Sequence, residues 1–340
     1  MVYVHIPFCE SFCTYCDFYS ELACKGGFEA FQHCLGREIE ERAGQIRSTA
    51  GVNTLYFGGG TPSLLSAGQI ASIAGGISKV FSPDSFWTYD EFTVEVNPED
   101  IVRKGEEYVR ALLEAGVNRI SMGVQSLSDE ILRWMNRRHD AAGARQAFSI
   151  LRSAGVENIS VDVIFGVAGL DDAVLESTVA EILSWKPEHI SAYQLSIEEG
   201  SALARMVAEG RYTEASDEQC RVQYELICSL LSGAGYHHYE ISNWALPGKE
   251  AVHNSAYWER CPYVGLGPGA HSLAGNVRSW NSENLSEWSS QSEILGEQEI
   301  REEELMLGLR TEKGYGGMVI PEKDWFIADS IIADYATKIL

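Results

Sequence analysis

Short hydrophobic runs alternate with amphipathic stretches along the first part of the chain. The runs are rich in β-branched and aromatic side chains, which favour strands, and the stretches between them have helical spacing. The runs predict six strands, at Tyr3–Ile6, Thr54–Phe57, Phe92–Val96, Arg119–Met122, Ile159–Phe165 and His189–Leu195. The stretches predict helices at Phe28–Ile46, Gln69–Val80, Glu106–Ala115, Ala141–Ala154 and Ala173–Trp185.

This alternation predicts an α/β fold with a parallel sheet, and right-handed crossovers curl such a sheet into a barrel. We therefore expect a partial (β/α)6 barrel of the TIM type over residues 1–232. After about residue 200 the rhythm changes, and a helical stretch at Glu218–Leu231 precedes a segment rich in Gly, Pro and aromatic residues. Residues 233–340 are expected to form a smaller, shortened C-terminal α/β segment, with a surface connection at Ser282–Glu304 and a short helix over Glu302–Leu309.

Composition narrows the class of protein. A chain of 340 residues with 45% hydrophobic residues can bury a large core. No apolar run is long enough for a membrane span, and the chain opens with a strand-like run, so we expect neither an integral membrane segment nor export. Eight cysteines are too few and too unevenly placed for a secreted disulfide scaffold, which predicts a cytoplasmic protein. The net charge of -23 argues against a nucleic-acid partner.

Three cysteines near the amino terminus carry the strongest chemical signal. Cys9, Cys13 and Cys16 have the spacing C-x3-C-x2-C. Three thiolates are one fewer than a closed four-cysteine cluster site, so a four-iron cluster held here keeps one iron free for another ligand. A structural zinc site is the alternative, and it needs a fourth ligand, for which His5 is the candidate.

The cysteine spacing and its neighbours resemble the radical S-adenosylmethionine (radical SAM) superfamily. In that superfamily the open iron of a [4Fe-4S] cluster is chelated by the amino and carboxylate groups of SAM, and one electron from the cluster cleaves the sulfonium. The resemblance therefore implies a [4Fe-4S] cluster and SAM as cofactors.

Polar residues and glycines follow the predicted strands, and the carboxyl ends of barrel strands form the active face. The triple glycine at residues 58–60 leaves the backbone bare for a close ligand. Glu95 suits the ribose hydroxyls of SAM, and Arg137 suits its carboxylate. Ordinary alternatives stay open, since Gly58–Gly60 can be a tight turn, Glu95 a helix-start carboxylate, Arg137 an exposed helix-end cation and Asp162 a strand-end cap.

Four longer phrases narrow the resemblance: Tyr3–Cys9, Tyr56–Ser63, Ser121–Ser126 and Asp162–Gly166. They are similar to the family that holds the oxygen-independent coproporphyrinogen III oxidases (HemN) and the HemW heme chaperones. The likeness covers roughly residues 1–280. It implies that the cluster ligands are Cys9, Cys13 and Cys16, and that the contacts of the cluster-bound SAM are Tyr3, Gly59, Gly60, Thr61 and Glu95. It also matches residues that touch a second SAM in the oxidase: Gln125, Arg137 and Asp162.

Two features favour the chaperone branch over the oxidase branch. Oxidases carry a further cysteine where this chain has Phe18, and they have a long N-terminal extension. The element His253-Asn254-Ser255-Ala256-Tyr257-Trp258 is similar to an HNxxYW signature that in HemW proteins is implicated in heme binding. By this resemblance His253 is the candidate heme ligand, with Tyr257 and Trp258 as packing partners. The alternative is that the His-Asn pair and the aromatics fasten a loop against the barrel mouth.

The resemblance implies a heme chaperone that binds heme or a porphyrin and delivers heme to an acceptor hemoprotein. Two alternatives from another class remain: a coproporphyrinogen dehydrogenase-like oxidoreductase of porphyrin biosynthesis, and a radical SAM enzyme with an unrelated substrate. Whether the chain is an enzyme is therefore left open. The chain departs from the family at Gly166–Leu170, where a Leu-Pro-Gly stretch is usual, and it ends soon after Leu305–Arg310, where the family's C-terminal domain begins.

Overall fold

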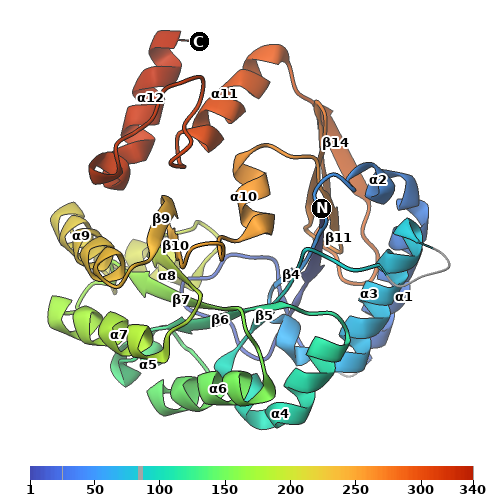
Figure 1. Cartoon of the computed structure of the whole chain (residues 1–340), viewed down its shortest axis with the longest axis horizontal. Coiled ribbons are helices and arrows are strands. Elements are labelled where there is room, and N and C mark those ends of the chain that lie inside the picture. The colour runs from blue at the N-terminus through green and yellow to red at the C-terminus, as the bar shows by residue number, and fades with distance from the viewer. Residues whose placement is uncertain (25, 83–86, 340) are drawn as a thin grey trace.

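A computed structural model describes residues 1–24, 26–82 and 87–339, and its centre is a curled parallel sheet (Figure 1). Six neighbouring parallel strands form this centre: β1 (Val2–Ile6), β4 (Thr54–Gly59), β5 (Glu91–Val96), β6 (Arg119–Gln125), β7 (Ile159–Phe165) and β8 (His189–Gln194). Each contains or coincides with one predicted strand, except that β8 ends one residue before the predicted strand. The predicted partial (β/α)6 barrel is confirmed.

Further strands extend the sheet at both edges. Strand β11 (Val264–Leu266) pairs with β1 in parallel. At the other edge β10 (Asn243–Ala245) pairs antiparallel with β8, and β9 (His237–Glu240) pairs antiparallel with β10. The sheet therefore continues across residue 232, where the sequence predicts the boundary between the barrel and the C-terminal segment.

Helices follow the strands and cover the outside of the sheet (Figure 1). They are α1 (Gly27–Glu41) with the short α2 (Ala43–Ser48) after it, α3 (Ala67–Phe81), α4 (Pro98–Glu114), α6 (Ala141–Ala154), α7 (Asp172–Trp185) and α9 (Asp217–Gly233). The single helix predicted over Phe28–Ile46 is wrong, because the chain breaks into α1 and α2 at Arg42. Helix α4 starts at Pro98, eight residues before the predicted start, and bends at Gly105, whose φ is 70°.

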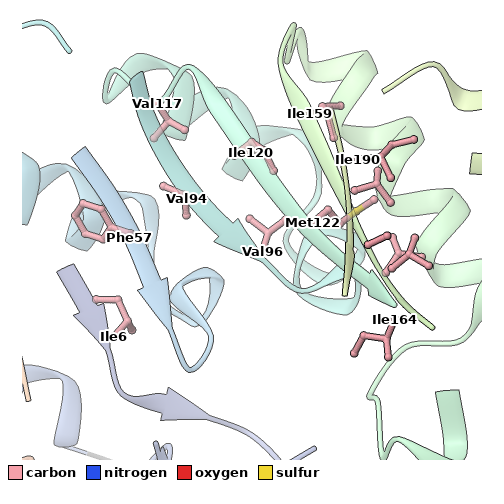
Figure 2. Close-up of a cluster of buried hydrophobic side chains, with 14 of the residues drawn as sticks. Ile6, Phe57, Val94, Val96, Val117, Ile120, Met122, Ile159, Ile164 and Ile190 are labelled. Atoms are coloured by element: carbon pink, nitrogen blue, oxygen red, sulfur yellow. The ribbon is translucent and has the colours of Figure 1, made fainter. Parts of the chain in front are cut away.

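The sheet has a polar inner face and an apolar outer face. Side chains alternate along each strand. In β5, for example, Glu91, Thr93 and Glu95 alternate with Phe92, Val94 and Val96. The apolar rows of neighbouring strands gather beneath the helices, as Figure 2 shows for Val94, Ile120, Ile159 and Ile190, all of which are buried. The core therefore lies between sheet and helices, and polar side chains are left for the interior of the barrel.

The remaining elements lie outside this repeating pattern. Strands β12 (His271–Ala274), β13 (Val277–Asn281) and β14 (Ser290–Ile294) form a small antiparallel sheet, followed by α11 (Glu297–Gly308) and α12 (Ala328–Ile339). The predicted surface connection at Ser282–Glu304 is thus wrong, since it contains β14 and much of α11. All five residues of β14 are exposed, so the strand shows no hydrophobic alternation. The predicted short helix is α11, which begins five residues earlier than expected.

Several short elements complete the fold. They are β2 (Phe8–Cys9), β3 (Glu21–Leu22), the 3₁₀ helix η1 (Pro62–Leu64), α5 (Asp129–Trp134), α8 (Ala202–Ala208), α10 (Val252–Trp258) and the 3₁₀ helix η2 (Glu322–Ile327). Helix α10 lies inside the ring of elements, between β11 and β10 (Figure 1). Across the residues described above, none of the helices has the length and apolar character that a bilayer crossing requires.

Candidate functional site

A cavity of about 1010 Å³ opens at the carboxyl ends of the barrel strands. Ten of the twelve predicted site residues line it: Cys9, Cys13, Cys16, Gly59, Gly60, Thr61, Glu95, Gln125, Arg137 and Asp162. The other two, Tyr3 and His253, are not among its lining residues. Residues from six strand ends, far apart in sequence, are thus brought to one cavity, as the barrel prediction requires.

The loop that carries the three cysteines is fastened at both of its ends and in its middle. Strands β2 and β3 pair in parallel, and the amide of Ala23 donates to the carbonyl of Cys9 at 2.9 Å. In the middle of the loop, the Thr14 amide donates to Met135, and the Thr14 carbonyl accepts from Leu203 at 2.8 Å. The loop is therefore held against α5 on one side and α8 on the other, which fixes the cysteines over the cavity.

The three thiols suit a cluster that binds each of them at a different iron. Arg137 donates from Nη1 to Cys13 Sγ at 3.3 Å and from Nη2 to the Gly123 carbonyl at 2.8 Å, so a cation stands beside one sulfur. Burial raises the pKa of Cys16 to about 11, so a thiolate there needs a metal cation to stabilise it. In the described part of the chain, no three His, Cys, Asp or Glu side chains converge closely enough to share a single metal ion. This spread is compatible with a cluster, in which each thiolate meets its own iron.

His5, the fourth ligand that a zinc site would need, is engaged elsewhere. Its Nε2 lies 2.8 Å from the Tyr19 carbonyl, and its Nδ1 lies 3.2 Å from the hydroxyl of Tyr3. Because a carbonyl can only accept, Nε2 carries the proton and Nδ1 accepts from Tyr3. Both ring nitrogens are thus engaged, Nε2 by the cysteine loop and Nδ1 by Tyr3 of β1, which argues against zinc. Tyr3, predicted to contact SAM directly, supports the loop through His5.

The triple glycine lets the end of β4 approach the cysteine loop closely. Gly59 has a φ of 106°, in the left-handed region, and a Cβ atom there would lie 2.6 Å from the ring of His5. A Cβ on Gly60 would lie 2.7 Å from the Phe8 carbonyl oxygen and 3.1 Å from Cys9 Sγ. Next to it, Thr61 Oγ1 is 3.5 Å from the same sulfur. Bare backbone is therefore required beside the first cysteine.

Two carboxyl groups and one guanidinium form the polar wall of the cavity. Glu95 Oε1 accepts from Tyr56 at 2.8 Å, and both oxygens of Asp162 lie 3.2 Å from Ser121 Oγ. Burial is the main cause that raises the pKa of both carboxyl groups, and the charge of Asp162 also raises the pKa of Glu95. The positive charge of Arg119, which is 1% exposed, acts in the opposite direction on both. Arg119 was not predicted as a site residue. It is an odd-numbered position of β6, like Gln125, and every second side chain of a strand points to the same face.

The raised pKa of Glu95, about 7 against an ordinary 4.5, predicts a pH dependence of stability. Between these two values the folded protein keeps a proton that the unfolded chain has released. The free energy of unfolding therefore falls as pH rises through this window. We expect Glu95→Gln, which cannot ionise, to lose this part of the fall, at most about 3 kcal/mol in the apoprotein. Urea unfolding at about pH 5 and about pH 8 measures it.

The control for this experiment is Glu106→Gln, which removes an exposed carboxylate that pairs with Arg110 on α4. Its stability difference from the wild-type protein is expected to stay within about 0.5 kcal/mol at both pH values. Parallel pH profiles for Glu95→Gln and the wild-type protein would contradict the assignment.

A buried ion-pair network behind the cavity was also not predicted from the sequence. Asp100 is fully buried, accepts from Ser63 at 2.7 Å, and pairs with Arg103 and Arg138. The same two arginines pair with Glu10, which lies between the first two cysteines. The network ties the cysteine loop to α4 and to the segment after β4. Its partners are far apart in sequence, so periodicity does not predict it.

Gln125 and Arg137 meet at a strained bend of β6. Gln125 has a φ of 65°, which is uncommon for a residue with a side chain, and the pairing of β6 with β7 shifts between Gly123 and Gln125. The bend brings the Gln125 amide and the Arg137 guanidinium next to Gly123, where a Cβ would lie 2.9 Å from Gln125 Nε2 and 3.3 Å from Arg137 Nη2. Such strain is common at binding sites.

His253 lies at the opposite ends of the strands from the cysteines. It is 1% exposed, and its ring nitrogens lie 2.8 Å from Thr54 Oγ1 and 3.2 Å from the Tyr257 hydroxyl. Glu91 accepts from the first amides of α10, including that of His253 at 3.2 Å. Thr54 and Glu91 are the first residues of β4 and β5. Helix α10 therefore closes the barrel at the amino ends of its strands. The ring of the predicted heme ligand is not presented to the cavity, whereas Asn254 lines it.

Comparison with known proteins agrees with this geometry. Residues 3–182 match the model of the radical SAM superfamily. The chain is 34% identical to the heme chaperone HemW of Bacillus subtilis over 99% of this chain and 91% of the relative. It is 32% identical to the heme chaperone HemW of Mycobacterium tuberculosis over 98% of this chain and 87% of that one.

A solved structure shares the fold. Coproporphyrinogen III oxidase (HemN) from Escherichia coli, described as a radical SAM enzyme, superposes with a TM-score of 0.75 at 22% identity, over 91% of this chain and 75% of that one. The chain belongs to the radical SAM superfamily and, within it, to the HemW family.

Proposed function

We propose that this protein is a heme chaperone that holds a [4Fe-4S] cluster and SAM at the mouth of its barrel and delivers heme to acceptor hemoproteins. The observation that carries the proposal is the identity to HemW of Bacillus subtilis across 99% of the chain, which includes the C-terminal segment as well as the barrel. Membership of the radical SAM superfamily implies the cluster and SAM. The heme and its acceptor are suggested by the names of the relatives.

The cavity offers a consistent set of roles for its residues. Cys9, Cys13 and Cys16 would hold the cluster, which when bound supplies an open iron for SAM and an electron. Gly60 and Thr61 lie directly beside the sulfur of Cys9, where they would contact a ligand bound next to the cluster. The polar wall then supplies acceptors for the ribose hydroxyls at Glu95.

The other predicted site residues are Gln125, Arg137, Asp162, Tyr3 and His253. Gln125, Arg137 and Asp162 line the same cavity, where by the resemblance they would contact a second SAM. Tyr3, which by the resemblance would contact the cluster-bound SAM, is linked to the cysteine loop through His5. His253 as a heme ligand requires its ring to leave Thr54 or Tyr257, and it stays a prediction.

We further propose a cytoplasmic location and assign the two parts of the chain, residues 1–232 and 233–340, to the barrel and its C-terminal extension. All eight cysteines are free thiols, and those of the cluster loop need a reducing environment to stay so.

The test is heme transfer. Protein reconstituted anaerobically with iron and sulfide is loaded with one equivalent of heme, separated from free heme, and mixed with apomyoglobin as a model acceptor. We expect stoichiometric heme binding by the Soret band, followed by transfer to the acceptor. Failure of the wild-type protein to bind heme would refute the proposal.

Coproporphyrinogen III oxidation is the competing function, because the fold is also that of HemN. The same reconstituted protein is given coproporphyrinogen III, SAM and a reductant, and loss of propionate carboxyl groups is followed by mass spectrometry. Decarboxylation at enzyme-like rates, of about one per second or more, would replace the chaperone assignment.

A further inference from the structure

Large aromatic side chains stand exposed around the mouth of the cavity. Phe12 is 49% exposed, Phe18 is 66% exposed and Tyr193 is 41% exposed, and all three line the cavity. Phe12 and Phe18 belong to the cysteine loop, and Tyr193 belongs to the end of β8. Exposed apolar groups that line a cavity are typical of a binding surface. The mouth therefore presents exposed aromatic side chains in the same cavity as the three cysteines.

One cation at this mouth has no side-chain partner among the described residues. Arg205, on α8, lines the cavity and is exposed, and no hydrogen bond or ion pair engages its guanidinium. The other cavity arginines are committed or enclosed: Arg137 binds Cys13 and Gly123, Arg138 pairs with Asp100, and Arg119 is buried. A free guanidinium is therefore available to a ligand.

The negative charge around the cavity favours Arg205 as the position at which a ligand carboxylate binds. The chain carries a net charge of -23, and Asp17, Glu198 and Glu283 also line the cavity. These carboxylates repel an anionic ligand, so a ligand carboxylate is accepted best at Arg205, which can bind it through two parallel N–H donors. Helix α8 keeps Arg205 close to the cysteine loop, because the amide of Leu203 donates to the Thr14 carbonyl.

We propose that this mouth is the heme-docking surface, with the porphyrin ring packed on Phe12 and Phe18 and one propionate bound by Arg205. The proposal rests on the proposed chaperone function and gives it a site. A flat apolar ring with carboxylates at one edge matches exposed aromatics beside one unpaired cation. Heme is then bound at the cluster end of the barrel, away from His253.

The test measures separately how the porphyrin ring and the propionates contribute to heme binding. Heme and heme dimethyl ester, whose propionates carry no charge, are titrated into anaerobically reconstituted wild-type protein and Arg205→Gln. We expect Arg205→Gln to bind heme about tenfold more weakly, with little change for the ester. Phe18→Ser is expected to weaken both ligands. Arg211→Gln is the matched control, because Arg211 is also exposed but pairs with Glu209 and does not line the cavity.

The outcomes distinguish the two proposals. Heme binding by the wild-type protein with unchanged affinity in Arg205→Gln and Phe18→Ser would overturn the docking surface and leave the chaperone function standing. No heme binding by the wild-type protein would overturn both. A loss of SAM affinity in Arg205→Gln with unchanged heme affinity would assign the guanidinium to SAM and overturn the docking surface.

Discussion

Cys13→Ala is expected to abolish the iron–sulfur cluster while leaving the protein folded. Cys13 is the middle cysteine of the loop, and its sulfur faces Arg137 in the cavity. With two thiolates left, the cluster lacks the third corner that a three-cysteine site needs. Iron and sulfide after anaerobic reconstitution should fall from about four of each per chain to background, and the Mössbauer spectrum of the cluster should disappear.

The control is Cys24→Ala. Cys24 belongs to the same amino-terminal region but is exposed and does not line the cavity. Cluster content in this variant should equal that of the wild-type protein. Thermal unfolding of both apoproteins should stay close to the wild-type transition, because neither side chain belongs to the buried core. A full cluster in Cys13→Ala would refute the three-cysteine site, as would zinc in the purified wild-type protein.

Gly60→Ala is the second large expected effect. A Cβ at this position would lie 2.7 Å from the Phe8 carbonyl oxygen and 3.0 Å from the Ile6 carbonyl oxygen. Neither atom can move without shifting the backbone that leads into the cysteine loop, and the hydrogen bond from the Gly60 amide to Ile6 would be strained as well. We expect a destabilisation of about 3 kcal/mol and at least a tenfold weaker binding of SAM to the reconstituted protein. Calorimetric titration with SAM and urea unfolding measure the two effects.

Gly75→Ala provides the comparison. Gly75 lies inside α3, and a Cβ there meets no atom within 4 Å. The same chemical change is therefore expected to stabilise the protein by about 0.5–1 kcal/mol through helix propensity, with SAM affinity unchanged. If Gly60→Ala behaved like Gly75→Ala, the close approach of β4 to the cysteine loop would be disproved.

The hydrophobic pattern was sufficient to predict the barrel. Each core strand is a short apolar run because its outer row is buried beneath helices, and this signal is local. A strand that is not buried has no hydrophobic alternation from which it could be predicted, as in the fully exposed β14. The division of Phe28–Ile46 into α1 and α2 was not visible either, because Arg42 at the break serves tertiary contacts: its guanidinium donates to the Gly265 carbonyl and to Ser272 Oγ.

The site was predictable to the extent that it follows the strand ends. Motifs placed the cysteines, the glycines and Glu95 correctly in one cavity, because the barrel topology alone brings strand ends together. Contacts between distant segments were not predictable. Asp100 and Arg138 are 38 residues apart and meet only in the folded chain. Arg205 lies on α8, a short helix that the pattern did not reveal, and its proposed role rests on the absence of a side-chain partner among the described residues.

The strict alternation of polar and apolar side chains along the core strands limits how the length of this chain can vary. Adding or deleting a single residue inside β5 would exchange the row of Glu91, Thr93 and Glu95 with the row of Phe92, Val94 and Val96. Carboxylates would then be buried in the hydrophobic core between sheet and helices, and apolar side chains would line the cavity. Changes of length are therefore expected in exposed connections outside the cysteine loop, whereas β5 must keep its length or change it by two residues at a time.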